Sequence, residues 1–314
     1  MQTIDLNRIF GRKNDRAITG IAMMDDSIGL VKAEWKNGTR VVTACDVISV
    51  HEDGDSLINM VNRYGLDKSR GSLLLSGKDY SLFVIEAPNV PDSEMVDAVR
   101  WRIRDLVDIP EDDAVIDVFD MPYAGVGTRS IYVVVARKSL IQGKITMLED
   151  NRLSAEIVDI PELAIRNLVG AMSDNPDATV VLFLSEKTGL LSIIKGEHVY
   201  ISRTLDIGYR SLRGDDSVQF GLDQIVLEIQ RSMDYYESHF RLGSVRKALV
   251  CGMEDADVTL VPYIQSNLGL DVSEVDANEF IASDAGVDLA LTRKHAVCAL
   301  ALGAALRRKE AIPS

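Results

Sequence analysis

The strongest constraint on the fold is a pattern of three short strands that occurs twice along the chain. In the first copy, residues 18–50, apolar runs are separated by turns at Asp25-Asp26-Ser27 and Lys36-Asn37-Gly38. In the second copy, residues 179–205, the turns lie at residues 185–189 and at Gly196-Glu197. Polar and glycine-containing breaks between apolar runs are typical of strands joined by tight turns. Because helical sequence follows each copy, the pattern predicts an internal duplication within the α/β class.

The sequence between the two copies predicts a small inserted subdomain with both strands and a helix. Strand-like runs lie at residues 73–76, 81–86, 115–119 and 131–136, and a helix follows the turn Pro91-Asp92-Ser93. The expected organisation is a flexible N-terminal segment (1–16), a first core subdomain (17–70 with 138–175 and 293–310), an α+β insert (71–137), and a second half (176–292) with a helical subdomain at about 213–245.

Two helices in the second half of the chain have different patterns. Residues 218–240 place apolar side chains three and four residues apart, which is typical of a helix with one buried face. Residues 293–308 instead carry small side chains on every side, among them Ala301, Gly303 and Ala305. Because small side chains allow close backbone approach, this helix is predicted to be buried against a sheet.

The net charge of the chain argues against nucleic-acid partners and limits contact with anionic membranes. The chain has a net charge of −14 and an isoelectric point near 4.8. A nucleic-acid-binding surface needs cations that replace the counterions of the phosphate backbone, and anionic lipid repels an acidic body. We therefore expect no nucleic-acid partner. Residues 6–13 combine Leu6, Ile9 and Phe10 with basic side chains, which would allow weak contact with a membrane surface. The alternative is a frayed, solvated terminus.

Cysteine and histidine spacing indicates neither a disulfide framework nor a metal site. Cys45, Cys251 and Cys298 show no CxxC spacing, and the four histidines are scattered. This pattern is typical of a reduced intracellular protein. The most apolar segment, residues 296–306, is too short to cross a bilayer, and no signal-peptide pattern opens the chain. The expected location is therefore the cytoplasm.

Four stretches of the chain carry a resemblance to a known family. They are residues 20–34, residues 95–109 with Ala98-Val99-Arg100-Trp101, residues 228–240 with Arg231-Ser232-Met233-Asp234-Tyr235-Tyr236, and residues 249–269. In these stretches the chain resembles the PilM-type proteins of type IV pilus assembly, in particular those of mannose-sensitive haemagglutinin (MSHA) pili. The resemblance implies a duplicated actin-like (RNase H-like) ATPase fold with an inserted subdomain. It also implies a scaffold, peripheral at the inner membrane, that binds the cytoplasmic tail of a PilN-type membrane protein and other pilus platform proteins.

The resemblance also locates the first of the turns that hold ATP in nucleotide-binding members. Those members typically read Gly-Ile-Asp-Ile-Gly-Ser-Ser at this turn, with the aspartate linked to magnesium. Here Gly20 is kept, but Ala22 replaces the aspartate and Met24 replaces a glycine. Without a metal, further carboxylates would repel a triphosphate. The polar residues left in the turn are Asp25, Asp26 and Ser27.

The second and third nucleotide elements are altered as well. Phe183-Leu184-Ser185 stands where the family has Asp-Ile-Gly, although Lys187 and Gly189 still offer a charge and a flexible amide. The adenine-side loop is reduced to Cys251-Gly252 and three following residues. These changes remove carboxylates that phosphoryl transfer requires. We therefore expect degenerate nucleotide loops, no cofactor and no ATPase activity. The alternative is a nucleotide-binding ATPase that uses ATP and magnesium to regulate pilus assembly.

Arg100, Trp101 and Arg104 are the first candidates for partner binding, because tryptophan and arginine dominate the energetics of many interfaces. The alternative is that Trp101 is buried and the arginines pair with nearby acids. Residues 131–136 are a second candidate, as an open sheet edge that an extended tail could join. The acids that could pair with Arg100 and Arg104 in the alternative with a buried Trp101 are Asp97, Asp105 and Asp108.

One further family alternative remains. The actin-like cytoplasmic part of a type II secretion platform protein of the GspL type has the same expected fold, but a membrane helix usually follows it. We expect no such helix here, since the chain ends in the polar sequence Arg307-Arg308-Lys309-Glu310 and four more residues. Self-association of the chain, as in other actin relatives, is also left open.

Overall fold

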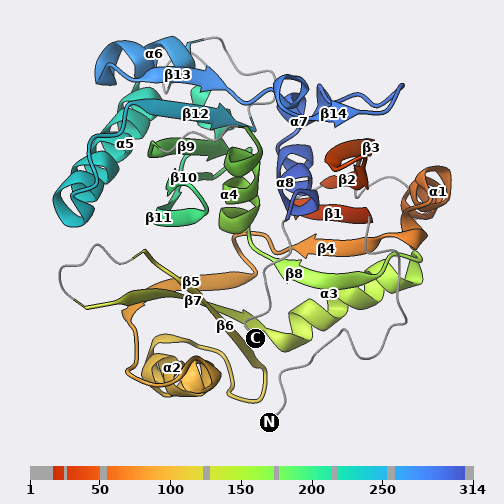
Figure 1. The fold of residues 1–314 in the computed structure, drawn as a ribbon, viewed down its shortest axis with the longest axis horizontal. Coiled ribbons are helices and arrows are strands. Elements are labelled where there is room, and N and C mark those ends of the chain that lie inside the picture. The colour runs from red at the N-terminus through yellow and green to blue at the C-terminus, as the bar shows by residue number, and fades with distance from the viewer. Residues whose placement is uncertain are drawn as a thin grey trace.

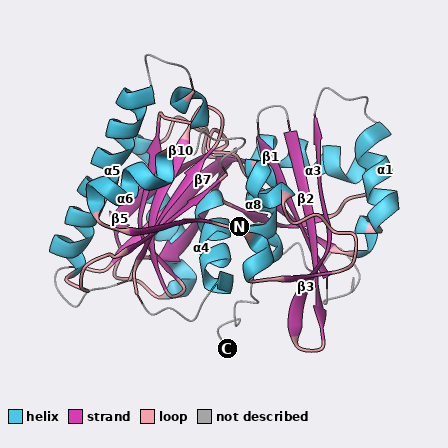
Figure 2. Ribbon diagram, turned by 90° about the horizontal axis from the view of Figure 1, so that it is seen from above, coloured by secondary structure: helices cyan, strands magenta, loops and turns pink. Residues whose placement is uncertain are grey.

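Two large mixed sheets, each covered by helices, and one smaller sheet make up the molecule (Figure 1). The computed structural model describes residues 17–24, 27–49, 55–122, 128–172, 177–213, 218–252 and 259–307. Seen from above, the two large sheets stand apart, with helices between them (Figure 2). The expected N-terminal segment 1–16 lies outside the described residues.

The first large sheet begins with the first strand repeat. β1, β2 and β3 form an antiparallel meander; β4 then pairs in parallel with β1, and β8 in parallel with β4. In spatial order the strands are β14 (Ala282–Ser283), β3 (Thr39–Ser49), β2 (Ser27–Lys36), β1 (Ala17–Met24), β4 (Arg70–Leu74) and β8 (Ala155–Asp159).

The second large sheet repeats this topology. β9, β10 and β11 form the meander, β12 pairs in parallel with β9, and β13 in parallel with β12. The spatial order is β11 (His198–Leu205), β10 (Gly189–Lys195), β9 (Thr179–Leu184), β12 (Lys247–Cys251) and β13 (Asp271–Glu274). The predicted duplication is therefore confirmed at the level of strand order and direction.

Helices cover both large sheets. Helix α5 buries the stripe predicted from the sequence, including Leu222, Ile229 and Tyr236, against the second sheet. The α-helices outside the insert are α1 (Asp55–Tyr64), α3 (Lys138–Asp150), α4 (Pro161–Met172), α5 (Val218–Phe240), α6 (Leu260–Leu268), α7 (Leu291–Lys294) and α8 (Ala296–Ala305). Short 3-10 turns are η2 (Leu66–Lys68), η3 (Asp92–Glu94), η4 (Arg104–Leu106), η5 (Tyr209–Leu212) and η6 (Ala277–Glu279).

Helix α8 lies at the centre of the molecule, and every residue from Ala296 to Ala305 is buried. Glycines on its neighbours permit this packing. A Cβ atom at Gly20 of β1 would lie 1.9 Å from the carbonyl oxygen of Ala301, and one at Gly29 of β2 would lie 2.6 Å from the backbone of Val297. The predicted burial of this helix against a sheet is confirmed. It begins later than predicted because extended backbone at His295 separates it from α7.

The third sheet belongs to the insert. β7 (Ser130–Arg137) lies between β5 (Tyr80–Glu86) and β6 (Ala114–Asp120), and α2 (Met95–Ile103) packs on one face of the sheet. Residues 131–136 are therefore central, so the prediction that they form an open edge is wrong. Their run of apolar side chains indicates burial on both faces, which is the property of a central strand.

The insert also begins later than predicted. Residues 71–74, assigned to the insert from the sequence, lie in β4, between β1 and β8 of the first large sheet. A short, continuously apolar run does not reveal which sheet it joins, because it lacks the alternation that marks a one-sided strand.

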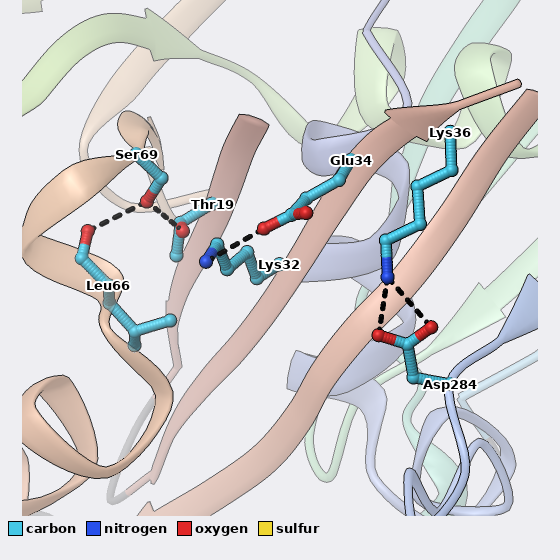
Figure 3. Close-up of polar contacts among 7 residues, drawn as sticks. All are labelled: Thr19, Lys32, Glu34, Lys36, Leu66, Ser69 and Asp284. Atoms are coloured by element: carbon cyan, nitrogen blue, oxygen red, sulfur yellow. Dashed lines mark hydrogen bonds and ion pairs between the residues drawn. The ribbon is translucent and has the colours of Figure 1, made fainter. Parts of the chain in front are cut away.

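Side-chain hydrogen bonds connect β1 to the turn before β4, and β2 to the residue after β14, in the first sheet (Figure 3). The hydroxyl of Ser69 donates to the carbonyl of Leu66 at 2.7 Å and is hydrogen bonded to the buried hydroxyl of Thr19 in β1. At the other side, Lys36 Nζ donates to both carboxylate oxygens of Asp284, at 2.8 and 2.6 Å. The second contact ties the strand β14, from late in the chain, to the first meander.

Candidate functional site

The end of β1 leads into the first of the predicted nucleotide turns. Gly20 lies within β1, paired with Val31 and Ser72, and its open side faces α8. Ser27 begins β2, opposite Met24. Asp25 and Asp26, the turn itself, lie outside the described residues. Gly20, predicted as part of a nucleotide turn, therefore allows α8 to pack closely on the sheet.

The second turn, between β9 and β10, is closed by its own hydrogen bonds. Ser185 N donates to the carbonyl of Thr188 at 2.8 Å, and Thr188 N donates to Ser185 Oγ at 3.2 Å. The carbonyls of Ser185 and Glu186 accept from the amides of Tyr209 and Arg210 at 2.9 and 3.1 Å. Because the amides of Ser185 and Thr188 are already engaged, they are not available to an anion in this conformation.

Gly189 and Gly252 are held by neighbouring backbone. A Cβ at Gly189 would lie 2.9 Å from the carbonyl oxygen of Ile207. Gly252 has φ +85°, and a Cβ there would lie 2.5 Å from the carbonyl oxygen of Leu184. The end of β12 therefore packs directly on the end of β9, as only glycine permits. Lys187 is exposed at the tip of the second turn.

One buried apolar cluster includes residues of β1, β9 and α8. Ala22 is 1% exposed and Phe183 is 3% exposed, and both belong to one buried cluster that α8 completes. Cys251 lies in the same cluster, where burial raises the pKa of its thiol to about 12. A thiol in this state is not a nucleophile at neutral pH. Within the part of the chain that is described, no group of three His, Cys, Asp or Glu residues could hold a metal ion.

A buried carboxylate links the insert, helix α4 and the second large sheet. Glu162, in the first turn of α4, accepts a hydrogen bond of 2.6 Å from the phenol of Tyr80 in β5 and one of 3.3 Å from Ser202 in β11. Its side chain is 2% exposed, and desolvation raises the pKa of its carboxyl. Sequence patterns did not single out Glu162 as a site residue. Its one signal was an acid directly after Pro161, which is common at a helix start.

The insert carries the most exposed large apolar side chain of the described residues. Trp101 on α2 is 74% exposed, so the alternative in which it is buried is wrong. It lies on the rim of a groove of about 230 Å³ together with Arg100, Arg104 and Glu111. The floor of the groove is apolar and is formed by Ile103, Val107, Ile109, Ala114 and Ile116.

Comparison with known proteins identifies the fold. No protein-family model and no curated protein sequence matches the chain. Among solved structures, a PilM–PilN type IV pilus biogenesis complex matches with a TM-score of 0.71 at 18% identity, over 94% of this chain and 99% of that chain. A protein of unknown function from Bacteroides thetaiotaomicron with an actin-like ATPase fold matches with a TM-score of 0.50 at 7% identity, over 89% of this chain and 96% of that chain. This chain has the actin-like fold.

A third actin-like relative comes from a secretion system. The cytoplasmic domain of EpsL, an inner membrane component of the type II secretion system of Vibrio cholerae, matches with a TM-score of 0.53 at 11% identity. The match covers 93% of this chain and 96% of that domain. No helix in the described ranges of the present chain is long and apolar enough to cross a membrane.

Two side chains of the apolar cluster can be compared with the nucleotide turns that the family resemblance predicts. Ala22 and Phe183 stand at the two positions where the family resemblance places carboxylates. Both side chains are buried, and neither carries an oxygen that could bind magnesium or orient water. An acid at either position would have to lose its hydration in this apolar surrounding.

Proposed function

We propose that this chain is an actin-like assembly-platform protein that binds segments of partner proteins and does not hydrolyse ATP. The observation that carries the proposal is the burial of Ala22 and Phe183 in one apolar cluster with α8. Phosphoryl transfer depends on positioned charges and metal ions, and apolar side chains supply neither. The closed hydrogen bonding of the Ser185–Thr188 turn supports the same view.

The partner that we propose is the cytoplasmic tail of a PilN-type inner-membrane protein, within a type IV pilus platform of the MSHA kind. Two findings support this. The described fold resembles that of the PilM–PilN complex over nearly its whole length, and the motifs around Trp101 and Arg231-Ser232-Met233 resemble the PilM-type family. The chain would then act in the cytoplasm, peripheral to the inner membrane. The likeness to the EpsL cytoplasmic domain favours a platform role of the same kind in secretion as the second candidate.

A pair of binding measurements tests the proposal. In thermal unfolding with ATP and magnesium, we expect no shift of the midpoint, whereas a ligand at about 100 times its dissociation constant stabilises a protein by about 2.7 kcal/mol. In calorimetry, we expect a synthetic PilN-type tail to bind the full chain saturably. An actin-like protein that binds ATP serves as the positive control in the first experiment.

Each half of the proposal has its own contradicting result. Magnesium-dependent ATP binding with turnover would overturn the statement that the chain is not an ATPase. Failure of PilN-type and GspL-partner tails to bind the correctly folded chain would overturn the platform role.

A further inference from the structure

We propose that the groove beside Trp101 binds an acidic peptide segment that inserts one large apolar side chain between α2 and β6. This inference rests on the proposed function, because it specifies the chemistry that a partner segment must have. It concerns the outer side of the insert, where α2 packs on the three-stranded sheet (Figure 1).

The shape and lining of the groove favour a side-chain anchor. Its volume of about 230 Å³ lies below the range of about 300–1,000 Å³ that is usual for small-molecule sites. Its floor is aliphatic, and Trp101 stands beside it with most of its ring in solvent. A second exposed apolar side chain is Leu106, in the turn that follows α2, which is 58% exposed. Exposed apolar side chains that cluster around a recess mark interaction sites more often than single exposed residues do.

The charge of the rim selects the partner. Arg100 and Arg104 lie one helical turn apart, and neither forms a hydrogen bond or ion pair with any residue in the described parts of the chain. The acids proposed as their partners from the sequence do not pair with them. Neighbouring arginines are occupied, because Arg102 donates to the carbonyl of Glu86 at 2.8 Å and Arg137 donates to that of Asp108 at 2.7 Å.

Two guanidinium groups without an acid partner among the described residues stand out in a chain of net charge −14. A guanidinium binds a carboxylate through two parallel hydrogen bonds, so acidic side chains that flank the anchor would complete the site. Among the residues that line the groove, Arg100 and Arg104 are the cations and Glu111 is the acid. The basic N-terminal segment 6–13 of this chain has the wrong charge to be the occupant.

An anionic membrane surface is the competing ligand for tryptophan and arginine together. The peptide is favoured for two reasons. The apolar floor is recessed between α2 and β6 and would not be reached by a flat bilayer surface. A bilayer would face much of the strongly acidic body of the chain and be repelled by it, whereas a short peptide would contact only the groove.

The test is fluorescence polarisation with a labelled nonapeptide that has a central leucine flanked by glutamates. We expect saturable binding to the full chain that weakens as salt rises, since exposed ion pairs are screened. Trp101→Ala should weaken binding about 30-fold, and the double variant Arg100→Gln, Arg104→Gln about tenfold. Arg102→Gln, on the same helix but bonded elsewhere, should bind as the wild type does. Circular dichroism checks that each variant is folded.

Two control peptides separate the contribution of the apolar anchor from that of the acidic side chains. Replacing the central leucine by alanine should lower affinity at every salt concentration. Replacing the glutamates by glutamines should lower it and remove the salt dependence. Equal binding of all three peptides, or no saturable binding of the acidic one, overturns the inference. So does Trp101-dependent binding to anionic vesicles in the absence of peptide binding.

The outcomes also separate this inference from the proposed function. A PilN-type tail that binds the wild type and Trp101→Ala equally well would overturn the groove while leaving the platform role in place. An acidic peptide that binds through Trp101, when no tail of a membrane partner does, would support the groove and count against the PilN-type assignment.

Discussion

The phenol of Tyr80 lies 2.6 Å from Oε2 of Glu162, so that a side chain of the insert donates a hydrogen bond to a buried carboxylate at the start of α4. Ser202 of the second sheet donates to the other oxygen of the same carboxylate. Three parts of the molecule therefore meet at one titratable group. Because that group has lost nearly all its contact with water, its pKa is raised and its state depends on pH.

Glu162→Gln is expected to gain stability relative to the wild type as the pH rises. The folded pKa of Glu162 is raised above its unfolded value, so the folded state binds the proton more tightly. This contribution to stability is full below the unfolded pKa and is lost as the pH rises through the folded pKa, at up to about 1.4 kcal/mol per pH unit. Urea unfolding of both proteins between about pH 5 and about pH 8 measures the difference.

Tyr80→Phe provides the control for this prediction. It keeps the ring but removes a donor that favours the charged carboxylate, so it should extend the pH dependence to higher pH. A wild type whose stability advantage over Glu162→Gln grows with rising pH would contradict the argument.

Gly20→Ala is expected to destabilise the chain by about 3 kcal/mol or more, because the added methyl would overlap the carbonyl oxygen of Ala301 in α8. Gly143→Ala in α3 is the matched control. No atom lies within 4 Å of the position of its Cβ, and alanine is the better helix former, so stability should rise by up to about 1 kcal/mol. Chemical unfolding of both variants tests the pair. Equal effects would show that α8 adjusts freely to β1.

The thiol of Cys251 is expected to resist alkylation in the folded chain. Its pKa of about 12 leaves only about one thiol in 10,000 ionised at pH 8, and the thiolate is the reactive form. Cys45 and Cys298 are also buried. Mass spectrometry after iodoacetamide treatment should therefore show little modification under native conditions and three modified cysteines in denaturant. Rapid native labelling of Cys251 would mean that the interior between the two sheets opens.

Trp101→Ala is expected to leave the free energy of unfolding unchanged within about 0.5 kcal/mol, since the ring is mostly exposed. Met95→Ala, on the buried face of the same helix, should cost about 2–5 kcal/mol. Urea unfolding of the two variants makes the comparison. If Trp101→Ala costs as much as Met95→Ala, the ring packs in the insert and is not held out for a partner.

The sequence predicted the parts of the fold that depend on local patterns. Two meanders with matching turns predicted the duplication, because strands and turns are set by near neighbours in the chain. The small residues of 296–306 likewise predicted a buried helix, since their lack of bulk is visible without knowing what packs on them. That Ala22 and Phe183 stand in place of carboxylates was implied by the family resemblance and not by a local pattern.

Tertiary structure alone decided the relationships between distant segments. β4 joined the first sheet and not the insert, and residues 131–136 became a central strand, because pairing partners are chosen across the chain by surfaces that no local pattern records. The meeting of Tyr80 with Glu162 and the exposure of Trp101 have the same origin. The burial of a residue depends on the tertiary packing around it, and the residue type alone does not determine which neighbours will cover it.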